Sequence, residues 1–308
     1  MPGAGWRFDK GNIMPELPEV EVIARGLRDT LVGRRVTAVR VFDERAVPGH
    51  TPEEFEQRVC GVDLCGVGRR GKLLLLDIRS SVEEGHTSAE GISEGRAAAS
   101  GSGMSVLTVH LRMTGRMVHG PAREAETHER IRFCLDDGSV LTFADVRRFG
   151  GCRVFTRNQL ERWSFWQSLG PEPLEVSTES FVERLQSRRA RIKGLLLDQR
   201  VIAGIGNIYA DESLFRAGIR PDALAAGLSA ERLAGLHASL REVLTQAIAE
   251  NGSSISDYRT ARGDAGAFQN SFQVYGRTGK TCLRCGGLLC GCKVAGRSTC
   301  YCPDCQTD

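Results

Sequence analysis

The stretch Met14-Pro15-Glu16-Leu17-Pro18-Glu19-Val20-Glu21-Val22 lies thirteen residues into the chain, yet it has the features of a chain start. If Met14 is removed, Pro15 becomes the N-terminal residue and its nitrogen becomes a secondary amine. An α-amino group titrates near pH ~8, so a fair fraction of it is unprotonated at neutral pH. Such an amine can attack an electrophilic carbon, and Glu16 beside it can move protons during the reaction.

The same stretch predicts a helix, because apolar residues recur at helical spacing from Val20 to Leu31. Pro18 suits a first turn, and Glu19 suits the positive end of a helix dipole. An ordinary helix cap would have the same residues, so other stretches have to decide between the two interpretations.

The composition indicates a soluble globular protein of two domains. The chain has 308 residues, of which 41% are hydrophobic and 26% charged, which is enough for sizeable cores. No apolar run reaches ~18 residues, so no membrane span is predicted. Residues 1–13 lack the apolar segment of a secretory signal and are a mis-called start, a processed leader or a disordered tail. If they are retained, the nitrogen of Pro15 is an unreactive amide.

Between residues 34 and 155 the sequence has the pattern of short β-strands. Apolar or alternating runs span 35–42, 73–78, 106–111, 131–135 and 140–143. They predict an antiparallel sandwich or barrel with a hairpin turn at Asp136-Asp137-Gly138. Residues 80–103 are mostly Gly, Ser, Ala and Glu, which predicts a disordered surface insertion between two paired strands.

The second half of the chain is predicted to be helical. The segment Leu169-Gly170-Pro171-Glu172-Pro173-Leu174 has the composition of a linker. Helical periodicity follows over 178–188, 190–199, 207–217 and 229–250, and the polar segment 252–270 predicts a mobile loop. The expected fold class is therefore α+β.

One motif is misleading. The run Gly66-Val67-Gly68-Arg69-Arg70-Gly71-Lys72-Leu73 nearly matches a phosphate-binding P-loop. The magnesium-binding hydroxyl after Lys72 is missing, and strand-like residues follow where a P-loop requires a helix. A nucleotide-hydrolysing enzyme is therefore rejected, and Lys72 remains a cation at a strand end.

Seven of the eleven cysteines lie between residues 282 and 305. Two CxxC pairs, sixteen residues apart, predict a closed structural zinc site in a reducing environment, with four thiolate ligands: Cys282, Cys285, Cys302 and Cys305. The three extra cysteines of this segment are expected to be free thiols: Cys290, Cys292 and Cys300. On a β-hairpin held by zinc, Arg297 could reach a phosphate or a base.

A further feature points to an anionic partner. Four cations lie on a predicted helix within residues 188–193, and the turn Gly204-Ile205-Gly206-Asn207 follows. Two glycines before an Asn that can cap a helix would expose backbone N–H groups as an anion site. Together with Arg297, these residues suggest a track for phosphates.

Taken in order, these motifs resemble those of the formamidopyrimidine-DNA glycosylase family, which are bifunctional base-excision repair enzymes. The resemblance extends from Met14 to about Gln306. Besides the zinc hairpin it rests on MPELPEVE (14–21), GRRGKLLLL (68–76), HLRMTG (110–115), DVRRFGG (145–151), LGPEPL (169–174), DQRVIAGIGNIYADESLFRAGIRP (198–221) and FQVYGRTG (272–279).

The resemblance implies two domains with DNA in the cleft between them. After a leader of residues 1–13, the implied parts are a catalytic β-sandwich domain (14–168), a linker (169–180), a helix–two-turn–helix domain (181–270) and a zinc-finger β-hairpin (271–308). A damaged purine would be flipped out of the duplex, as chemistry on a stacked base requires.

The resemblance also implies a role for each matching residue. Pro15 would be the imine-forming nucleophile and Glu16 the general acid/base at the sugar. Lys72 would donate a proton in β-elimination, and Arg297 would act in δ-elimination. This agrees with the chemistry expected of a free proline amine, which requires no redox cofactor and no catalytic metal.

Further positions match residues that contact DNA. Contacts to phosphates or to the duplex would come from His128, Arg147, Arg188, Lys193 and Asn207. The gap left by the flipped base would be filled by Met113, Arg147 and Phe149. Acidic positions near the lesion match Glu19 and Glu212, and residues 258–267 match a loop that closes over the extruded base.

The expected function is that of a DNA glycosylase with AP-lyase activity. It would remove oxidised purines, such as 8-oxoguanine and formamidopyrimidines, from double-stranded DNA and cut the abasic strand by β,δ-elimination. We expect a monomer in the bacterial cytoplasm. Two alternatives remain open: an endonuclease VIII-like enzyme that prefers oxidised pyrimidines, and a non-catalytic DNA-damage-binding protein that retains residues 1–13.

Overall fold

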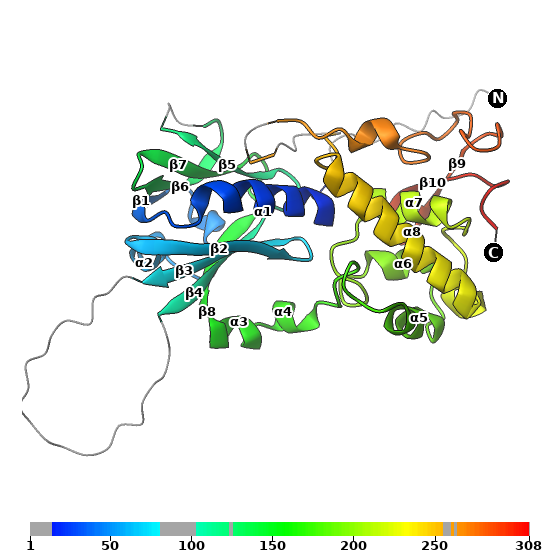
Figure 1. The fold of residues 1–308 in the computed structure, drawn as a ribbon, viewed down its shortest axis with the longest axis horizontal. Helices are drawn as coiled ribbons and strands as arrows, with labels where there is room; N and C mark the ends of the chain where they lie inside the picture. Colours follow the sequence, from blue (N-terminus) through cyan, green and yellow to red (C-terminus); the bar gives the residue numbers. More distant parts are fainter. Residues whose placement is uncertain (1–13, 81–102, 123–125, 255–259, 262–263, 308) are drawn as a thin grey trace, which may run out of the picture.

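The computed structural model describes residues 14–80, 103–122, 126–254, 260–261 and 264–307. The first half of the chain forms a β-rich part and the second half a helical part (Figure 1). Helix α1 (Leu17–Leu31) lies beside the sheets, and its N-terminal end reaches the helical part. The expected leader, and all but the two end residues of the expected insertion 80–103, lie outside the described residues.

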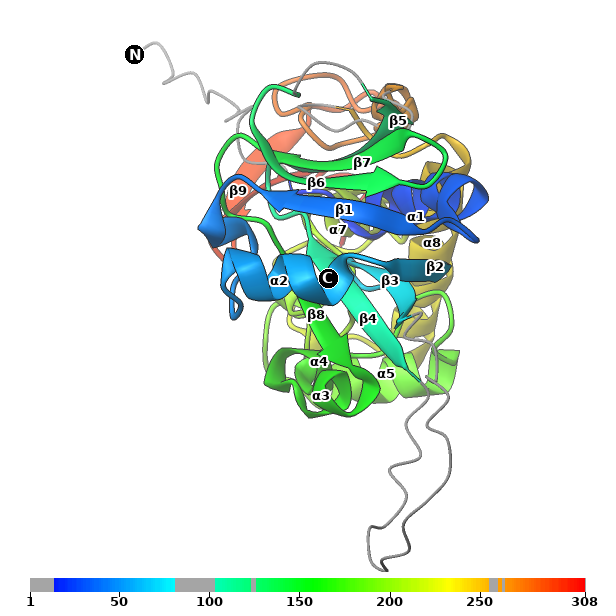
Figure 2. The ribbon, with the colours of Figure 1, turned by 90° about the vertical axis from the view of Figure 1, so that its left-hand side faces the viewer.

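Two four-stranded antiparallel sheets make up the β-rich part. One has the order β1 (Val36–Val41), β6 (Glu129–Leu135), β7 (Ser139–Asp145), β5 (Gly115–Pro121). The other has the order β2 (Val62–Arg70), β3 (Leu73–Ser80), β4 (Met104–His110), β8 (Gly151–Thr156). Figure 2 shows the two sheets as layers, and one hydrophobic core takes buried residues from both. The predicted antiparallel sandwich is thus confirmed.

Several elements of this part were not predicted from the sequence. They are the strands β2, β5 and β8 and the helices α2 (Pro52–Val59), α3 (Arg157–Arg162) and α4 (Ser164–Ser168). Strand β2 was missed because glycines and arginines interrupt its apolar residues. It pairs with β3 in a hairpin whose tip is Gly71-Lys72, with Gly71 at a φ of +56°. The P-loop-like motif is therefore a β-hairpin, which agrees with the rejection of a nucleotide-binding P-loop from the sequence.

The helical part contains the four predicted helices, each somewhat shorter than expected. They are α5 (Thr178–Gln186), α6 (Ile192–Leu197), α7 (Asn207–Arg216) and α8 (Ala230–Ala249), and they share a second hydrophobic core. The basic residues 188–191 lie between α5 and α6 and not on a helix, which corrects the prediction. Short 3-10 turns occur at Glu44–Ala46 (η1), Ala225–Gly227 (η2) and Phe268–Ser271 (η3).

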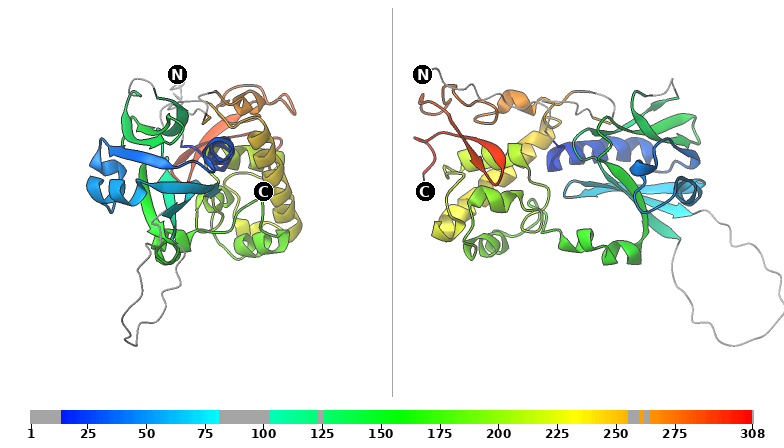
Figure 3. Two further views of the ribbon diagram at one scale, coloured as in Figure 1. Left: turned by 60° about the vertical axis from the view of Figure 1, so that its left-hand side comes forward. Right: turned by 180° about the vertical axis from the view of Figure 1, so that it is seen from behind.

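The chain ends in a β-hairpin of β9 (Cys290–Val294) and β10 (Arg297–Tyr301). Its two-residue turn has positive φ at both positions, 49° at Ala295 and 72° at Gly296, which suits the twist of a tight hairpin. Figure 3 shows this hairpin (red) alongside the C-terminal helices, and its buried Cys300 shares a small core with Phe215 of α7. No helix in the described part is both long and apolar enough to span a bilayer.

Candidate active site and zinc centre

A cleft of about 550 Å³ lies between the β-rich part and the helical part. The β-rich side contributes Met14, Glu16, Lys72, Met113 and Arg147. The other side contributes Leu197, Gly206, Asn207, Tyr275, Lys293, Gly296, Arg297 and Ser298. Three of the four predicted catalytic residues therefore line one cavity, and the fourth, Pro15, is buried directly beside Glu16.

The carboxylate of Glu16 is bound by the N-terminus of α7. The backbone N–H of Gly206 donates to Oε2 (2.8 Å), and that of Ile208 donates to Oε1 (3.0 Å). This corrects the expectation that the glycine turn offers an anion site to an external phosphate, because the protein's own carboxylate fills it. Asn207 is the first helical residue and not the cap, and its side-chain amide donates to the carbonyl of Ser298 (2.9 Å).

The two glycines of this turn allow α1 to come this close. A Cβ atom on Gly206 would lie 2.3 Å from Cδ of Glu16, and one on Gly204 would lie 2.7 Å from Leu17. Gly204 also has a φ of +87°, which strains any other residue. The N–H of Leu17 donates to the carbonyl of Gly204 (3.0 Å). The start of α1, with Glu16, is therefore docked on this turn.

Glu19 forms a second buried acidic site beneath Glu16. Its carboxylate accepts hydrogen bonds from the N–H of Glu16 (2.9 Å), the hydroxyl of Tyr209 (2.5 Å) and the N–H of Ser253 (2.8 Å). Burial, aided by the nearby charge of Glu16, raises the pKa of Glu19 to about 7. Burial also raises the pKa of Glu16, although Lys72 and the backbone hydrogen bonds oppose this shift.

Lys72 occupies the tip of the β2–β3 hairpin. Burial lowers its pKa, while the charges of Glu16 and Glu19 act in the opposite direction. The tip is fixed by Glu172 of the linker, whose buried carboxylate accepts hydrogen bonds from the N–H of Gly71 (2.5 Å) and from the guanidinium of Arg69. Sequence reasoning missed this role of Glu172, although the residue lies in the motif LGPEPL.

The predicted gap-filling residues lie on two loops, from which Met113 and Arg147 line the cleft. The loop after β7 is organised by buried Asp145, which accepts hydrogen bonds from the N–H groups of Arg147 (3.1 Å) and Gly150 (2.8 Å). This presents Phe149 to solvent with 58% of its side chain exposed, and the guanidinium of Arg147 lies 5.0 Å from its ring centre. Met113 lines the cleft from the other loop.

Two predicted DNA contacts lie outside the cleft. His128 is exposed immediately before β6 and has a φ of 65°. Arg188 is exposed between α5 and α6, and its Nε donates to the carbonyl of Arg184 (2.9 Å). Their contacts with DNA stay predictions.

Lys193 requires a correction. Its side chain is 0% exposed, and its ammonium pairs with Asp211 (2.6 Å) while donating to the hydroxyl of Thr299 (2.7 Å). It also donates to the carbonyl of Ser298 (3.2 Å). An ammonium that is buried and paired in this way is not accessible to a DNA phosphate. Lys193 instead ties α6 and α7 to the strand that carries Arg297.

Glu212 is likewise internal and does not line the cleft. Its carboxylate accepts the N–H groups of Gln273 (3.0 Å), Val274 (3.0 Å) and Tyr275 (2.8 Å), so it folds the segment that carries Tyr275 into the cleft. Sequence reasoning assigned no role to Tyr275, although it lies in the motif FQVYGRTG. Of the predicted loop 258–267, the described residue Ala261 reaches the β-rich core, where its carbonyl accepts the N–H of His119 (3.2 Å); residues 258–259 and 262–263 lie outside the described residues.

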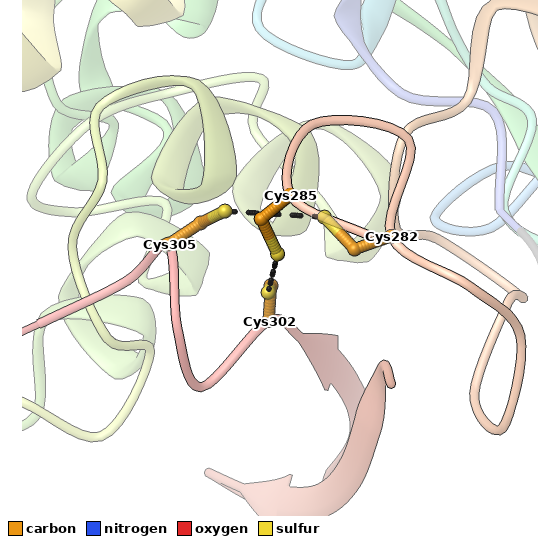
Figure 4. Close-up of side chains that lie close together, drawn as sticks. All are labelled: Cys282, Cys285, Cys302 and Cys305. Atoms are coloured by element: carbon orange, nitrogen blue, oxygen red, sulfur yellow. Dashed lines mark hydrogen bonds between the residues drawn. The ribbon is translucent and has the colours of Figure 1, made fainter. Parts of the chain in front are cut away.

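The four predicted zinc ligands converge on one point (Figure 4). All four sulfur atoms lie within 4.8 Å of one another, with Cys282–Cys305 at 3.9 Å and Cys285–Cys302 at 3.5 Å. A tetrahedron with Zn–S bonds of about 2.3 Å has edges of about 3.8 Å, so the site fits one zinc ion. Four protein ligands leave no open position, which makes the zinc structural. The three extra cysteines of the segment lie outside this cluster.

Comparisons with known proteins agree with this arrangement. Residues 14–152 match the model of the formamidopyrimidine-DNA glycosylase N-terminal domain, and residues 169–259 match the model of the formamidopyrimidine-DNA glycosylase H2TH domain. The chain is 45% identical to the formamidopyrimidine-DNA glycosylase of Nitratidesulfovibrio vulgaris and 41% identical to that of Geobacillus kaustophilus; each alignment covers 95% of this chain and 100% of the relative.

Solved structures with a similar fold include the Lactococcus lactis Fpg protein bound to DNA with an abasic site. It has a TM-score of 0.81 and 33% identity, and the match covers 95% of this chain and 100% of that one. A variant of that protein with DNA containing Fapy-dG has a TM-score of 0.82, with 33% identity over 96% of this chain and 100% of that one. The chain therefore belongs to the formamidopyrimidine-DNA glycosylase family.

Proposed function

We propose that the protein excises oxidised purines from double-stranded DNA and cuts the abasic strand, with the nitrogen of Pro15 as nucleophile. The observation that carries the proposal is the docking of Glu16, the chain neighbour of Pro15, on the N-terminus of α7, in a cleft shared with Lys72 and Arg297. The relatives are named formamidopyrimidine-DNA glycosylases, and similar structures hold abasic-site or Fapy-dG DNA.

The geometry suggests a role for each group in the reaction. The free amine of Pro15 attacks C1′ of the deoxyribose, the bond to the base breaks, and the resulting iminium makes the C2′ hydrogens acidic. Glu16 is close enough to exchange protons at the sugar ring. Lys72, with its lowered pKa, returns protons during β-elimination, and Arg297 faces the sugar from the zinc hairpin for δ-elimination.

The proposal requires a functional chain that begins at Pro15. The family model starts at residue 14, and 95% of this chain aligns with the whole length of its relatives. Met14 lines the cleft, so its removal would open the space beside the Pro15 nitrogen. Because the relatives are bacterial, we place the protein in the bacterial cytoplasm, with catalytic and helix–two-turn–helix domains at 14–168 and 181–270.

Excision assays on matched duplexes test this function. We expect release of 8-oxoguanine and formamidopyrimidine bases, and strand cleavage by β,δ-elimination, from a protein that begins at Pro15. Faster release of an oxidised pyrimidine would favour the endonuclease VIII-like alternative, and this substrate belongs in the assay because a similar Fpg structure holds DNA with an oxidised pyrimidine. Tight binding without base release would favour the non-catalytic alternative.

A further inference from the structure

A second hollow runs along the β-rich part, away from the Pro15 cleft. Two pockets of about 410 and 670 Å³ adjoin there, since both are lined by Pro48, Arg153 and Trp163. The smaller pocket reaches Phe149, and the larger one extends between α2 and α3. We call these two pockets together the outer groove.

The outer groove is basic. It is lined by one acidic residue, Glu54, and by five arginines: Arg45, Arg58, Arg112, Arg153 and Arg162. Glu54 is engaged locally, because its carboxylate accepts the N–H of Thr51 at the start of α2 (3.0 Å). Within the part of the chain that the structure describes, only Arg45 among the five forms an ion pair, with Asp43 (3.0 Å). The other four guanidinium groups are available to an anionic ligand.

Aromatic rings lie between these charges. Trp163 stacks on Phe155, with ring centres 4.9 Å apart, and contacts Phe165 at 4.8 Å. The guanidinium of Arg153 lies 5.5 Å from the Trp163 ring centre. All of these side chains are partly exposed. A groove that combines cations with stacked, accessible rings suits single-stranded nucleic acid, whose phosphates and unpaired bases need both.

The outer groove and the Pro15 cleft are lined by neighbouring residues of the same two loops. Phe149, a gap-filling residue, lines the inner pocket of the groove, as does Arg112, the chain neighbour of the cleft residue Met113. A strand that separates from the duplex at Phe149 would therefore start at a residue that lines the groove.

We propose that the outer groove binds single-stranded DNA that leaves the duplex at Phe149. The protein would then engage forks and strand ends in addition to continuous duplex. This deepens the proposed function and rests on it for the position of the duplex. The contacts of the groove with a single strand do not depend on catalysis.

Binding to undamaged DNA separates this proposal from the catalytic one. Wild-type protein should bind a duplex that carries a single-stranded 5′ or 3′ arm more tightly than it binds a blunt duplex. Arg153→Gln and Trp163→Ala should each reduce that preference by about fivefold or more, the effect of losing one stacked base. Blunt-duplex binding, 8-oxoguanine release and zinc content should stay at wild-type levels.

A matched control is available at the end of strand β1. Arg40 and Phe42 form an exposed pair, with the guanidinium 5.3 Å from the ring centre, and line neither pocket. The double variant Arg40→Gln/Phe42→Ala should keep the wild-type preference for a duplex with a single-stranded arm.

A second measurement uses tryptophan fluorescence. Oligothymidine should quench this fluorescence in the wild type, and it should do so less in Trp163→Phe, a variant that preserves packing. Equal wild-type affinity for armed and blunt duplexes, or an unchanged preference in both groove variants, would overturn the proposal. A failure of base release with intact arm binding would instead contradict only the catalytic proposal.

Discussion

At the scale of single residues, Glu16 connects the two halves of the chain. Its carboxylate accepts hydrogen bonds from backbone N–H groups at the start of α7, and Gly206 there is 190 residues away in sequence. Burial and these hydrogen bonds hold it beside the Pro15 nitrogen. A small change at the turn should therefore affect the chemistry more than the fold.

The variant Gly206→Ala tests this connection. The new Cβ would lie 2.3 Å from Cδ of Glu16, so the carboxylate has to move. We expect base release to slow by about 100-fold, the typical effect of misplacing a reacting group by about 1 Å, with zinc content unchanged. Gly68→Ala is the control, because a Cβ on Gly68 meets nothing within 4 Å. Equal activity of the two variants would show that base release does not depend on the position of the Glu16 carboxylate.

The buried carboxyl of Glu19 predicts a pH dependence of stability. Its pKa is raised from an ordinary 4.5 to about 7, so the folded state keeps a proton that the unfolded state loses between these values. Wild-type stability should therefore fall as the pH rises through this window. Relative to wild type, Glu19→Gln should gain up to about 3 kcal/mol in free energy of unfolding between pH 4.5 and 7. Urea denaturation at several pH values measures this gain, and a pH-independent difference would refute it.

Sequence motifs located the residues of the cleft better than they explained them. The CxxC spacing was sufficient to predict the zinc ligands, whereas the roles predicted for Pro15 and Glu16 needed the resemblance of several motifs together. The motifs did not predict that Glu16 occupies the glycine turn, or that Lys193 is buried against Asp211, because both depend on contacts between distant segments. A lysine in a basic run looks the same in sequence whether it faces solvent or a buried carboxylate.

At the scale of elements, the β2–β3 hairpin places Lys72 through its contact with the linker. Glu172 accepts the N–H of Gly71 and pairs with Arg69, so Glu172→Gln would set an amide against the guanidinium. We expect strand cleavage at a preformed abasic site to slow by about tenfold, because elimination depends on the position of the Lys72 side chain. Base release should slow less. Single-turnover rates of the two steps provide the measurement.

A control for this hairpin lies on β3. Asp77→Asn removes the partly exposed ion pair with Arg157 (2.7 Å) but leaves the hairpin tip unchanged. It should leave both steps near their wild-type rates. If Glu172→Gln slowed base release as much as elimination, the linker would support the whole cleft and not Lys72 in particular.

The zinc hairpin is an element whose position depends on the metal. It presents Lys293 and Arg297 to the cleft, so Cys285→Ser should lose zinc and weaken duplex binding together, by about tenfold or more. Metal analysis and a binding titration measure the two effects. Cys290→Ser is the matched control, because Cys290 belongs to the same segment but not to the four-sulfur cluster. Loss of zinc with unchanged binding would contradict this account of the hairpin.

Elements with a clear periodicity were predictable and the others were not. Helix α8 and strand β3 have strong apolar patterns and were expected close to their observed bounds. Strand β2 and the short helices α3 and α4 were missed, because their sequences have few apolar repeats and their structure depends on neighbours in the fold.

At the scale of the whole molecule, the cleft exists because α1 links the two cores. Most of its buried face belongs to the core of the β-rich part, while Leu17 and Val22 pack with Ile248 of α8. The order of strands in the two sheets, and therefore the meeting of Lys72 with Arg297, cannot be deduced from local sequence. The resemblance to a known family implied a cleft between two domains and roles for Lys72 and Arg297, and the structure adds the strand order and the contacts that bring them together.

Covalent trapping followed by peptide mass mapping tests the central claim most directly. Borohydride is added while the protein acts on a duplex with an abasic site, and the modified peptide is located in two forms of the chain. We predict an adduct on the nitrogen of Pro15 in protein that begins at this residue, and no adduct in protein that retains residues 1–14. Trapping on another residue, or cleavage of the abasic strand by the longer form, would contradict the account.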